Sequence, residues 1–228
     1  MTRARAVILV SGGGTNLQAF IDAVREGRID LEIAAVLSDN PTAHGLERAR
    51  RAGVPAVCVP RADYADRASF DRALGDAIAA RQPDIVILAG FMRVLGPELV
   101  ARFAGRMLNI HPSLLPAYRG LDTHRRALEA GERWHGCTVH FVTEELDGGP
   151  CIAQARVPVH PDDTPERLAA RVLEQEHRLY PWVAALLASG RLRYADGTAW
   201  LDDRPLTAPC TQTSNDRANL DLNLSPDP

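Results

Sequence analysis

The fold is decided close to the N-terminus, where an apolar run leads through a glycine-rich turn into a helical pattern: Ala6-Val7-Ile8-Leu9-Val10-Ser11-Gly12-Gly13-Gly14-Thr15-Asn16. The apolar run is short and continuous, which predicts a strand buried on both faces. Apolar residues at helical spacing then predict a helix over about residues 16–26. A buried strand followed by a helix is the opening unit of an open α/β sheet.

The same alternation continues along the first half of the chain. Further short apolar runs predict strands at Ile33–Leu37, Ala56–Val59, Ile85–Ala89 and Met107–Ile110. Helical periodicity between these runs predicts helices over about 43–52 and 66–81. Repeated strand–helix–strand steps imply right-handed crossovers, and therefore a parallel sheet covered by helices on both faces.

The second half follows a different pattern. Cys137–Thr143 and Ile152–Val159 predict two strands joined by a turn-rich link too short for a parallel crossover, so we expect an antiparallel element. Thr164 and Pro165 predict the start of a long helix, with threonine as the N-cap and proline in the first turn. Pro181 is expected to kink that helix or end it.

The predicted fold class is α/β, with an open, Rossmann-like, mostly parallel sheet, helices on both faces and an antiparallel element in the C-terminal half. Residues 192–206 contain a turn sequence that predicts a terminal hairpin. We expect a single domain over residues 1–207. Residues 208–228 form a polar tail rich in Asn, Asp and Ser, which predicts disorder.

Composition excludes several classes of function. The 228 residues carry a formal net charge of −3, which provides no basic field for nucleic acid or an anionic membrane. No apolar run approaches the ~20 residues that span a bilayer, and the N-terminus lacks the cleavage pattern of a signal peptide. All 26 basic residues are arginine, so lysine-dependent Schiff bases and Walker A loops are excluded. The four cysteines have no zinc-ligand spacing, and we expect no metal and a reducing, cytoplasmic location.

The glycine-rich turn is a candidate anion site. Glycines let a ligand approach the backbone, and a helix start offers unpaired N–H groups at the positive end of its dipole. A phosphate group suits that environment. The alternative is a turn that serves geometry alone, although a single glycine would suffice for it, and the spacing matches neither a dinucleotide loop nor a P-loop.

Asn109 and His111 form a second candidate site. Strand alternation places both on one side, at the carboxyl end of a predicted parallel strand, where open α/β sheets bind ligands. Pro112 favours an extended backbone at His111. An imidazole exchanges protons near neutral pH, and an amide can donate to a developing oxyanion. The alternative is a loop histidine that only makes structural hydrogen bonds.

Two carboxylates are further candidates. Asp147 lies in a Gly-rich turn, where aspartate commonly stabilises the turn; alternatively it faces His111 and stabilises the imidazolium. Glu176 falls on the apolar stripe of the predicted long helix. It either reaches water from the edge of that stripe or binds a ligand, because a buried carboxylate needs a partner.

The other histidines predict no metal site. His135 and His140 lie in one predicted strand but on opposite faces, so they do not chelate one ion. His124 and His177 lie on predicted helices without a partner one turn away.

Four segments together closely resemble the phosphoribosylglycinamide formyltransferase family. They are Ser11–Gln18, Leu88–Arg93, Asn109–Pro116 and Glu145–Pro150, in the expected order within about residues 4–206. The resemblance implies the formyltransferase fold and a folate-dependent step of purine synthesis. In that step the formyl group of 10-formyltetrahydrofolate, a co-substrate, passes to the amine of glycinamide ribonucleotide without a metal.

The resemblance also implies roles for individual residues. The catalytic set would be Asn109, His111 and Asp147. The ribonucleotide would be bound by Gly14, Thr15, Asn16 and Glu176. The folate would be bound by Arg67, Met92, Arg93, Val94, Leu95, Asn109, Thr143, Glu144, Glu145, Leu146 and Asp147. Asn109 and protonated His111 would donate to the formyl oxyanion, and residues 1–106 and 107–207 would be a nucleotide-binding half and a folate-binding, catalytic half.

Two departures from the family pattern keep the chemistry of the loop. Gly13 stands where asparagine is common, and Thr15 stands where serine is common. The alternative functions are a 10-formyltetrahydrofolate hydrolase, a formyltransferase acting on methionyl-tRNA, and a phosphometabolite-binding module. The first two usually carry an additional domain, which we do not expect here, and the third has no use for a catalytic set. We therefore expect small-molecule substrates, no nucleic acid and no membrane, in a monomer or homodimer.

Overall fold

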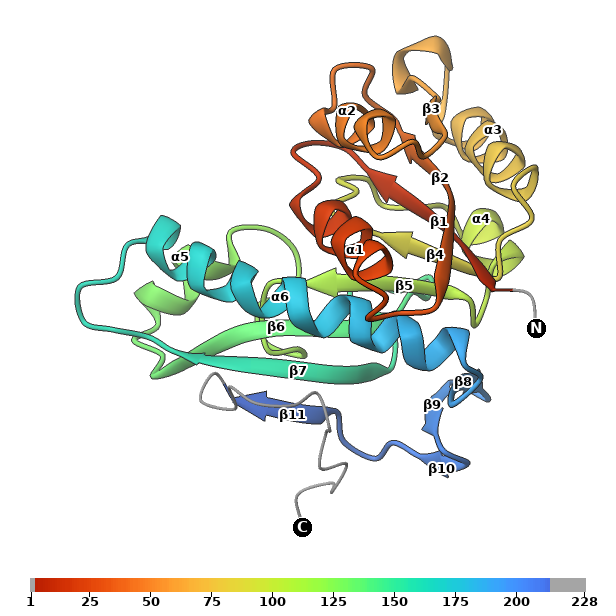
Figure 1. The fold of residues 1–228 in the computed structure, drawn as a ribbon. Helices are drawn as coiled ribbons and strands as arrows, with labels where there is room; N and C mark the ends of the chain where they lie inside the picture. The colour runs from red at the N-terminus through yellow and green to blue at the C-terminus, as the bar shows by residue number, and fades with distance from the viewer. Residues whose placement is uncertain (1–2, 214–228) are drawn as a thin grey trace.

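The computed structural model describes residues 3–213, and its main sheet has both parallel and antiparallel strands (Figure 1). The strands of this sheet are β1 (Ala4–Val10), β2 (Leu31–Ser38), β3 (Ala56–Cys58), β4 (Ile85–Leu88), β5 (Met107–His111), β6 (Trp134–Phe141), β7 (Cys151–Pro158) and β11 (Cys210–Thr213). Their spatial order is β11-β7-β6-β5-β4-β1-β2-β3. Only β6 runs antiparallel to its neighbours, which confirms the predicted fold class.

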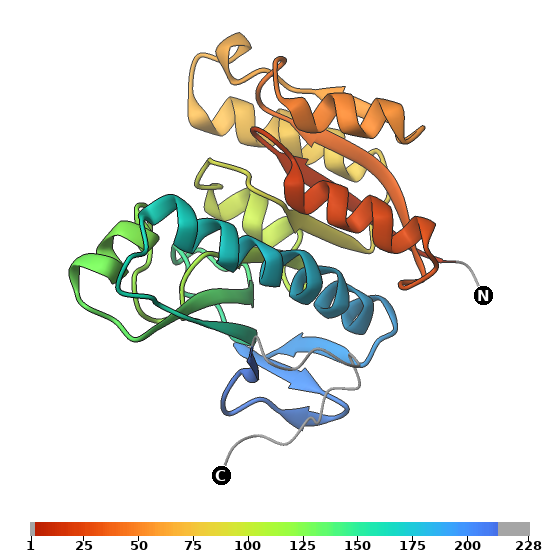
Figure 2. The ribbon, with the colours of Figure 1, turned by 60° about the vertical axis from the view of Figure 1, so that its left-hand side comes forward.

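Helices cover both faces of this sheet (Figure 2). They are α1 (Thr15–Arg25), α2 (His44–Arg51), α3 (Arg67–Ala79), α4 (Pro97–Arg102), α5 (Thr123–Glu129) and α6 (Pro165–Ala188), with a 3-10 turn at Arg61–Asp63. Strand β1 illustrates the division. Ile8 packs in the cluster under α1, α2 and α6, whereas its neighbour Leu9 packs in the cluster under α3 and α4.

The long helix α6 begins as predicted and continues past its internal proline. The Thr164 side chain accepts a hydrogen bond from the Arg167 N–H at 3.3 Å, and Pro165 occupies the first turn. The expectation that Pro181 could end the helix is wrong, because α6 continues to Ala188. Its C-terminal part packs into the core through buried residues such as Val183, and this burial outweighs one lost hydrogen bond.

The C-terminal region is more ordered than the sequence predicts. The expected hairpin is present as β8 (Leu192–Ala195) and β9 (Thr198–Leu201), and β10 (Arg204–Pro205) adds a third antiparallel strand. Disorder from residue 208 onward is wrong for β11, which pairs in parallel with β7. The open backbone edge of β7 provides hydrogen-bond partners that a composition argument does not include. Residues 214–228 lie outside the described residues.

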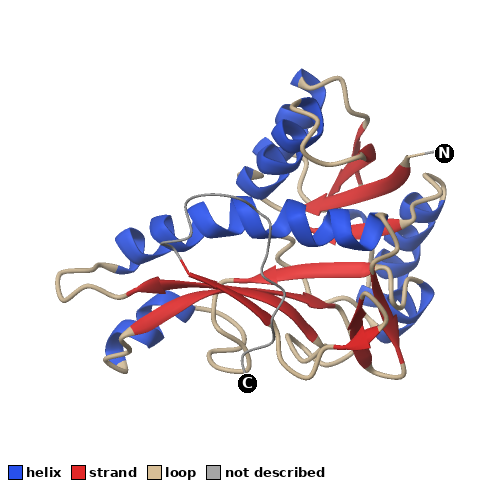
Figure 3. Cartoon of the chain, turned by 60° about the horizontal axis from the view of Figure 1, so that its bottom comes forward, coloured by secondary structure: helices blue, strands red, loops and turns tan. Residues whose placement is uncertain are grey.

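The two faces of strands β5 and β6 carry different residues. Alternating residues of β5 and β6, such as Leu108 and Val139, pack toward α6, which lies across these strands (Figure 3). Asn109 and His111 point to the opposite face, away from α6.

Within residues 3–213, no helix has the length and apolar character needed to cross a membrane.

Candidate active site

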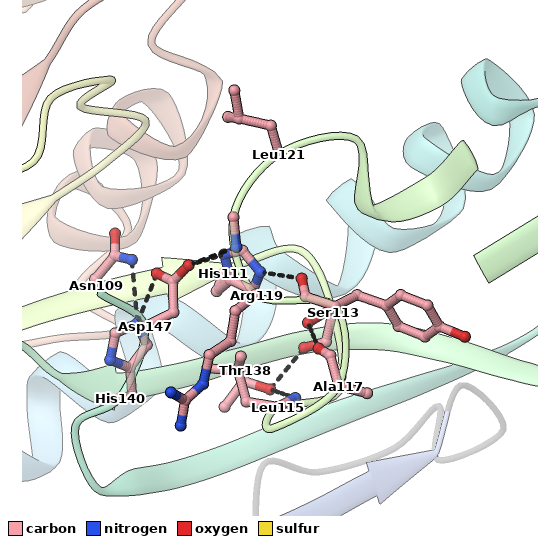
Figure 4. A network of polar contacts seen from close by, with 12 residues as sticks. Asn109, His111, Ser113, Leu115, Ala117, Arg119, Leu121, Thr138, His140 and Asp147 are labelled. Carbon is pink, nitrogen blue, oxygen red and sulfur yellow. Dashed lines mark hydrogen bonds and ion pairs between the residues drawn. The ribbon is translucent and has the colours of Figure 1, made fainter. Parts of the chain in front are cut away.

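The structure brings Asn109, His111 and Asp147 together from two distant segments (Figure 4). Asn109 and His111 project from β5, and Asp147 comes from the loop that follows β6. The His111 Nδ1 atom lies 3.3 Å from Asp147 Oδ2, and both side chains are buried. On the other side of the ring, His111 Nε2 donates to the Tyr118 carbonyl oxygen at 2.9 Å. Both imidazole nitrogens are therefore engaged within the chain.

The turn that carries Asp147 is shaped to present its carboxylate. Asp147 has a φ of 49°, a left-handed conformation that aspartate tolerates better than most residues. Gly149 has no alternative here, because a Cβ at that position would lie 1.9 Å from the Phe141 carbonyl oxygen. The Gly120 N–H donates to Asp147 Oδ2 at 3.0 Å. The turn-forming and partner-facing interpretations of Asp147 are thus compatible.

His140 belongs to the same cluster, although the sequence indicated no function for it. It is paired with Asn109 across β5 and β6, and the Asn109 Nδ2 group donates to His140 Nε2 at 3.1 Å. His140 Nδ1 donates to the Phe141 carbonyl oxygen at 2.9 Å. Burial lowers the pKa of His140, which favours the neutral ring that this arrangement requires. Only the strand register, which the sequence does not reveal, could have identified this contact.

A network under the loop 112–120 anchors its first part, at Ser113 and Leu115. Thr138 Oγ1 donates to the Ser113 carbonyl oxygen at 2.6 Å and accepts from the Leu115 N–H at 3.0 Å. Gln154 Nε2 donates to the Leu115 carbonyl oxygen at 2.8 Å. Thr138 and Gln154 come from β6 and β7, so the sheet itself supports the loop beside the candidate catalytic set.

A second histidine contact joins two elements, so helical spacing could not predict it. His124 has no partner one turn away on its own helix, but α5 packs beside β6 and brings His124 Nδ1 to 3.2 Å from His135 Nε2. Burial and the neighbouring His124 lower the pKa of His135 to about 4. Within residues 3–213, no group of three or more His, Cys, Asp or Glu side chains could hold a metal ion.

The glycine-rich turn packs closely against α2. Gly14 precedes α1 with a φ of 69°, and a Cβ there would lie 2.7 Å from the Gly45 Cα atom of α2. The first N–H groups of α1 have no acceptor within the helix. Thr15 also lines a cavity of about 610 Å³ together with Arg48, whose Nε–H donates to the Gly13 carbonyl oxygen at 2.8 Å and so places positive charge beside the turn.

Asn16 and Glu176 form a buried pair between α1 and α6. Asn16 is 8% exposed, and its Nδ2 group donates to Glu176 Oε2 at 2.7 Å. The interpretation in which Glu176 reaches water is therefore wrong. Burial raises the pKa of Glu176, and the hydrogen bond from Asn16 partly opposes that effect. Asn16 Oδ1 is buried without a partner among the described residues, so the pair retains an unused acceptor.

Apart from Asn109 on β5, the residues assigned to folate fall into two groups. Met92, Arg93, Val94 and Leu95 follow β4, with Arg67 at the start of α3, and Thr143 to Asp147 follow β6. Met92 is 68% exposed, and Val94 and Leu146 are also exposed, which is unusual for large apolar side chains and is typical of binding surfaces. Leu95 differs from these residues, because it is buried in the core under α3 and α4.

Comparison with known proteins assigns the family. Residues 4–184 match a family model described as Formyl transferase. The chain belongs to the formyl transferase family. This formyl transferase is 51% identical over 200 residues to phosphoribosylglycinamide formyltransferase of Escherichia coli (strain K12), a match that covers 88% of the chain and 94% of the relative. The family implies a folate-derived formyl donor.

Solved structures of other proteins agree with this assignment. The phosphoribosylglycinamide formyltransferase of Coxiella burnetii superimposes with a TM-score of 0.87 at 48% identity, covering 90% of this formyl transferase and 96% of that chain. A formyltetrahydrofolate deformylase of Pseudomonas syringae pv. tomato has a TM-score of 0.80 at 26% identity, covering 88% and 66%. The fold is thus shared with a hydrolase, whereas the higher identity is to formyltransferases.

Proposed function

We propose that this enzyme transfers the formyl group of 10-formyltetrahydrofolate to the amine of glycinamide ribonucleotide, in purine synthesis. The observation that carries the proposal is the convergence of Asn109, His111 and Asp147 at the edge of the sheet that also holds the glycine-rich turn. Strands β1, β4 and β5 are adjacent and parallel, so their carboxyl ends meet at one edge. One edge can then hold two ligands.

The ribonucleotide is held at its phosphate and ribose. The free N–H groups at Gly14, Thr15 and Asn16 bind the phosphate at the positive end of α1. Glu176 accepts from the ribose hydroxyls and keeps its contact with Asn16. Binding energy from these remote groups aims the amine at the formyl carbon, and such positioning is worth ~7–11 kcal/mol in favourable cases.

Charge on the tetrahedral intermediate is stabilised by Asn109. One N–H of its amide is committed to His140, which leaves the second N–H free to donate to the oxyanion. His111 can donate as well only if one of its present contacts, with Tyr118 or with Asp147, is exchanged for the ligand. This refines the expectation in which His111 donates directly.

Proton movement is assigned to Asp147. The amine nitrogen forms a bond to the formyl carbon, the bond from that carbon to folate N10 breaks, and one proton passes from the amine to N10. Asp147 relays this proton through a water and orients the His111 ring through its contact with Nδ1. The amine is already a nucleophile, so no serine or cysteine needs activation.

We also propose that residues 1–207 act as one domain, to whose sheet β11 adds an edge strand from beyond that boundary. The division into a nucleotide-binding half and a catalytic half does not hold strictly, because each proposed site draws residues from both halves. Glu176, from the second half, bonds Asn16 of the first, and the residues assigned to folate come from both halves.

The test mixes the enzyme with 10-formyltetrahydrofolate, with and without glycinamide ribonucleotide, and follows tetrahydrofolate release. Release that depends on the ribonucleotide supports the proposal. Release without it indicates the hydrolase, and no release under either condition rejects both activities. His111→Ala is the matched control, because it removes a proposed catalytic group and leaves the glycine-rich turn intact.

A further inference from the structure

A buried carboxylate joins the two proposed substrate sites. Asp39 lies directly after β2, and its side chain is only 5% exposed. Asp39 Oδ1 accepts a hydrogen bond from the Ser11 hydroxyl at 2.6 Å. Asp39 Oδ2 accepts from the Arg93 Nε–H, in a close ion pair. Ser11 opens the glycine-rich turn and Arg93 belongs to the segment after β4, so one side chain contacts both.

Ser11 closes this set of contacts into a ring. The Met92 N–H donates to Ser11 Oγ at 2.9 Å, and the Ser11 N–H donates to the Gly90 carbonyl oxygen at 3.1 Å. The hydroxyl of Ser11 thus accepts from the folate-side segment and donates to Asp39. A displacement of Ser11 must disturb both the segment and the carboxylate.

The buried charge of Asp39 favours the arrangement in which Ser11 and Arg93 both contact its carboxylate. A carboxylate that has lost its hydration is costly unless charged or polar groups replace the water. For Asp39, Ser11 and Arg93 replace this water. The Arg93 side chain is 41% exposed. The Arg93 guanidinium carbon also lies 5.9 Å from the centroid of the Phe70 ring. Asp39 and Phe70 therefore both position the Arg93 side chain.

We propose that Asp39 is a positioning residue that couples the two substrate sites by holding Ser11 and Arg93 in one arrangement. The inference rests on the proposed function, which assigns the ribonucleotide to the Ser11 side and the folate to the Arg93 side. A ligand that orders one segment then orders the other through Asp39. Each substrate strengthens binding of the other by the same factor, because equilibrium coupling is reciprocal.

Asp71 provides a matched comparison. It is also a buried carboxylate beneath an arginine assigned to folate, because it lies 3.5 Å from Arg67 Nε and accepts from the Gly96 N–H at 2.8 Å. Both of these partners lie on the folate side. Asp71 thus has the burial and charge of Asp39 without a hydrogen bond to the glycine-rich turn.

The experiment measures the Kd of glycinamide ribonucleotide by calorimetry, with and without saturating tetrahydrofolate, a product that carries no formyl group to transfer. The wild-type enzyme is expected to bind the ribonucleotide about 5-fold or more tightly when tetrahydrofolate is present. Asp39→Ala should bring this ratio close to one. Asp39→Asn should give an intermediate ratio, because its amide oxygen still accepts from Ser11 but carries no charge to hold Arg93.

Asp71→Asn is expected to weaken tetrahydrofolate binding and leave the coupling ratio at its wild-type value. The inference is overturned if the wild-type ratio is one, if Asp39→Ala keeps the wild-type ratio, or if Asp71→Asn abolishes it equally. Asp39→Asn is nearly isosteric and carries the test if the alanine variant does not fold. If the wild-type enzyme transfers formyl groups and Asp39→Ala keeps the wild-type coupling ratio, the inference is rejected but the proposed function stands. If the wild-type enzyme transfers no formyl group, the proposed function itself is rejected.

Discussion

At the level of single residues, burial and hydrogen-bond partners together set whether each polar group in the site acts as a donor or an acceptor. His140 accepts from Asn109 and has a lowered pKa, whereas Glu176 accepts from Asn16 and has a raised one, because burial disfavours the charged form of either group. The acceptor and donor roles in the site are therefore set before a ligand binds. Replacing one member of such a pair leaves the other unsatisfied.

Asp147→Asn should lower kcat about 100-fold or more and change the KM of either substrate by only a few-fold. The asparagine keeps the size of the side chain but cannot relay a proton. Steady-state kinetics measure the effect. Asp76→Asn, at an ion pair with the exposed Arg102, is the control. A near-native kcat in Asp147→Asn would remove this residue from the mechanism.

Asn16→Ala should raise the KM for the ribonucleotide about 10-fold and affect the KM for folate much less. The variant also leaves Glu176 buried without its donor, which should lower the free energy of unfolding by about 1–3 kcal/mol. Kinetics at saturating folate, combined with urea unfolding, separate the two effects. An unchanged KM for the ribonucleotide would contradict the assignment of this residue to substrate binding.

His135 predicts a specific pH dependence of stability. Its pKa falls from 6.5 to about 4 on folding, so between these values the unfolded chain binds a proton that the folded chain does not. The free energy of unfolding should therefore decrease as the pH falls from 6.5 to 4, and His135→Gln should show a smaller decrease. Urea unfolding over this range measures the difference, with His160→Gln at an exposed histidine as the control. Equal slopes in wild type and His135→Gln would be inconsistent with the shift.

At the level of elements, α6 is the part of the chain that relates the two halves of the molecule. Its 24 residues contribute Glu176 to the pair with Asn16, and its buried face packs against α1, β6 and β7. Strand β11 completes the sheet at the other edge of β7, where an unpaired strand would otherwise face solvent. Both elements are far in sequence from the groups they support.

Removal of β11 should destabilise the enzyme and promote self-association. A chain ended after Ala208 loses the strand, whereas a chain ended after Thr213 keeps it and is the matched control. The loss of pairing with β7 should lower the free energy of unfolding by about 1–3 kcal/mol. Urea unfolding and sedimentation measure the two effects. If the two truncated chains behave alike, β11 has no stabilising role.

At the level of the whole molecule, the two halves share one core rather than meeting at an interface. A single cluster of buried residues includes Leu17 of α1, Val139 of β6 and Val172 of α6. Tyr180 is fully buried. Its hydroxyl is the hydrogen-bond donor shared by the Leu88 carbonyl oxygen, at 3.1 Å, and the Leu108 carbonyl oxygen, at 2.9 Å. It thus joins α6 to both β4 and β5.

The enzyme should therefore unfold in one cooperative transition, and Tyr180→Phe should lower its free energy of unfolding by about 1–3 kcal/mol without splitting that transition. Circular dichroism and tryptophan fluorescence in urea should give coincident midpoints in both proteins. Two separate midpoints in the wild type would indicate that the halves are independent domains.

Local patterns determined the order and type of most elements. Continuous apolar runs indicated the parallel strands, because such strands are buried on both faces, and Thr164-Pro165 marked the start of α6 through chemistry within one turn of helix. Strand alternation also placed Asn109 and His111 on one face. These features depend on residues a few positions apart, and a sequence displays such spacing directly.

Tertiary structure alone decided which distant groups meet. The pairing of Asn109 with His140 depends on strand register, the contact of His124 with His135 on the packing of α5, and the burial of Glu176 on the approach of α1. The continuation of α6 beyond Pro181 and the formation of β11 depend on burial and on an open strand edge. Burial and hydrogen-bond satisfaction are properties of the assembled chain, so residue spacing along the sequence does not contain them.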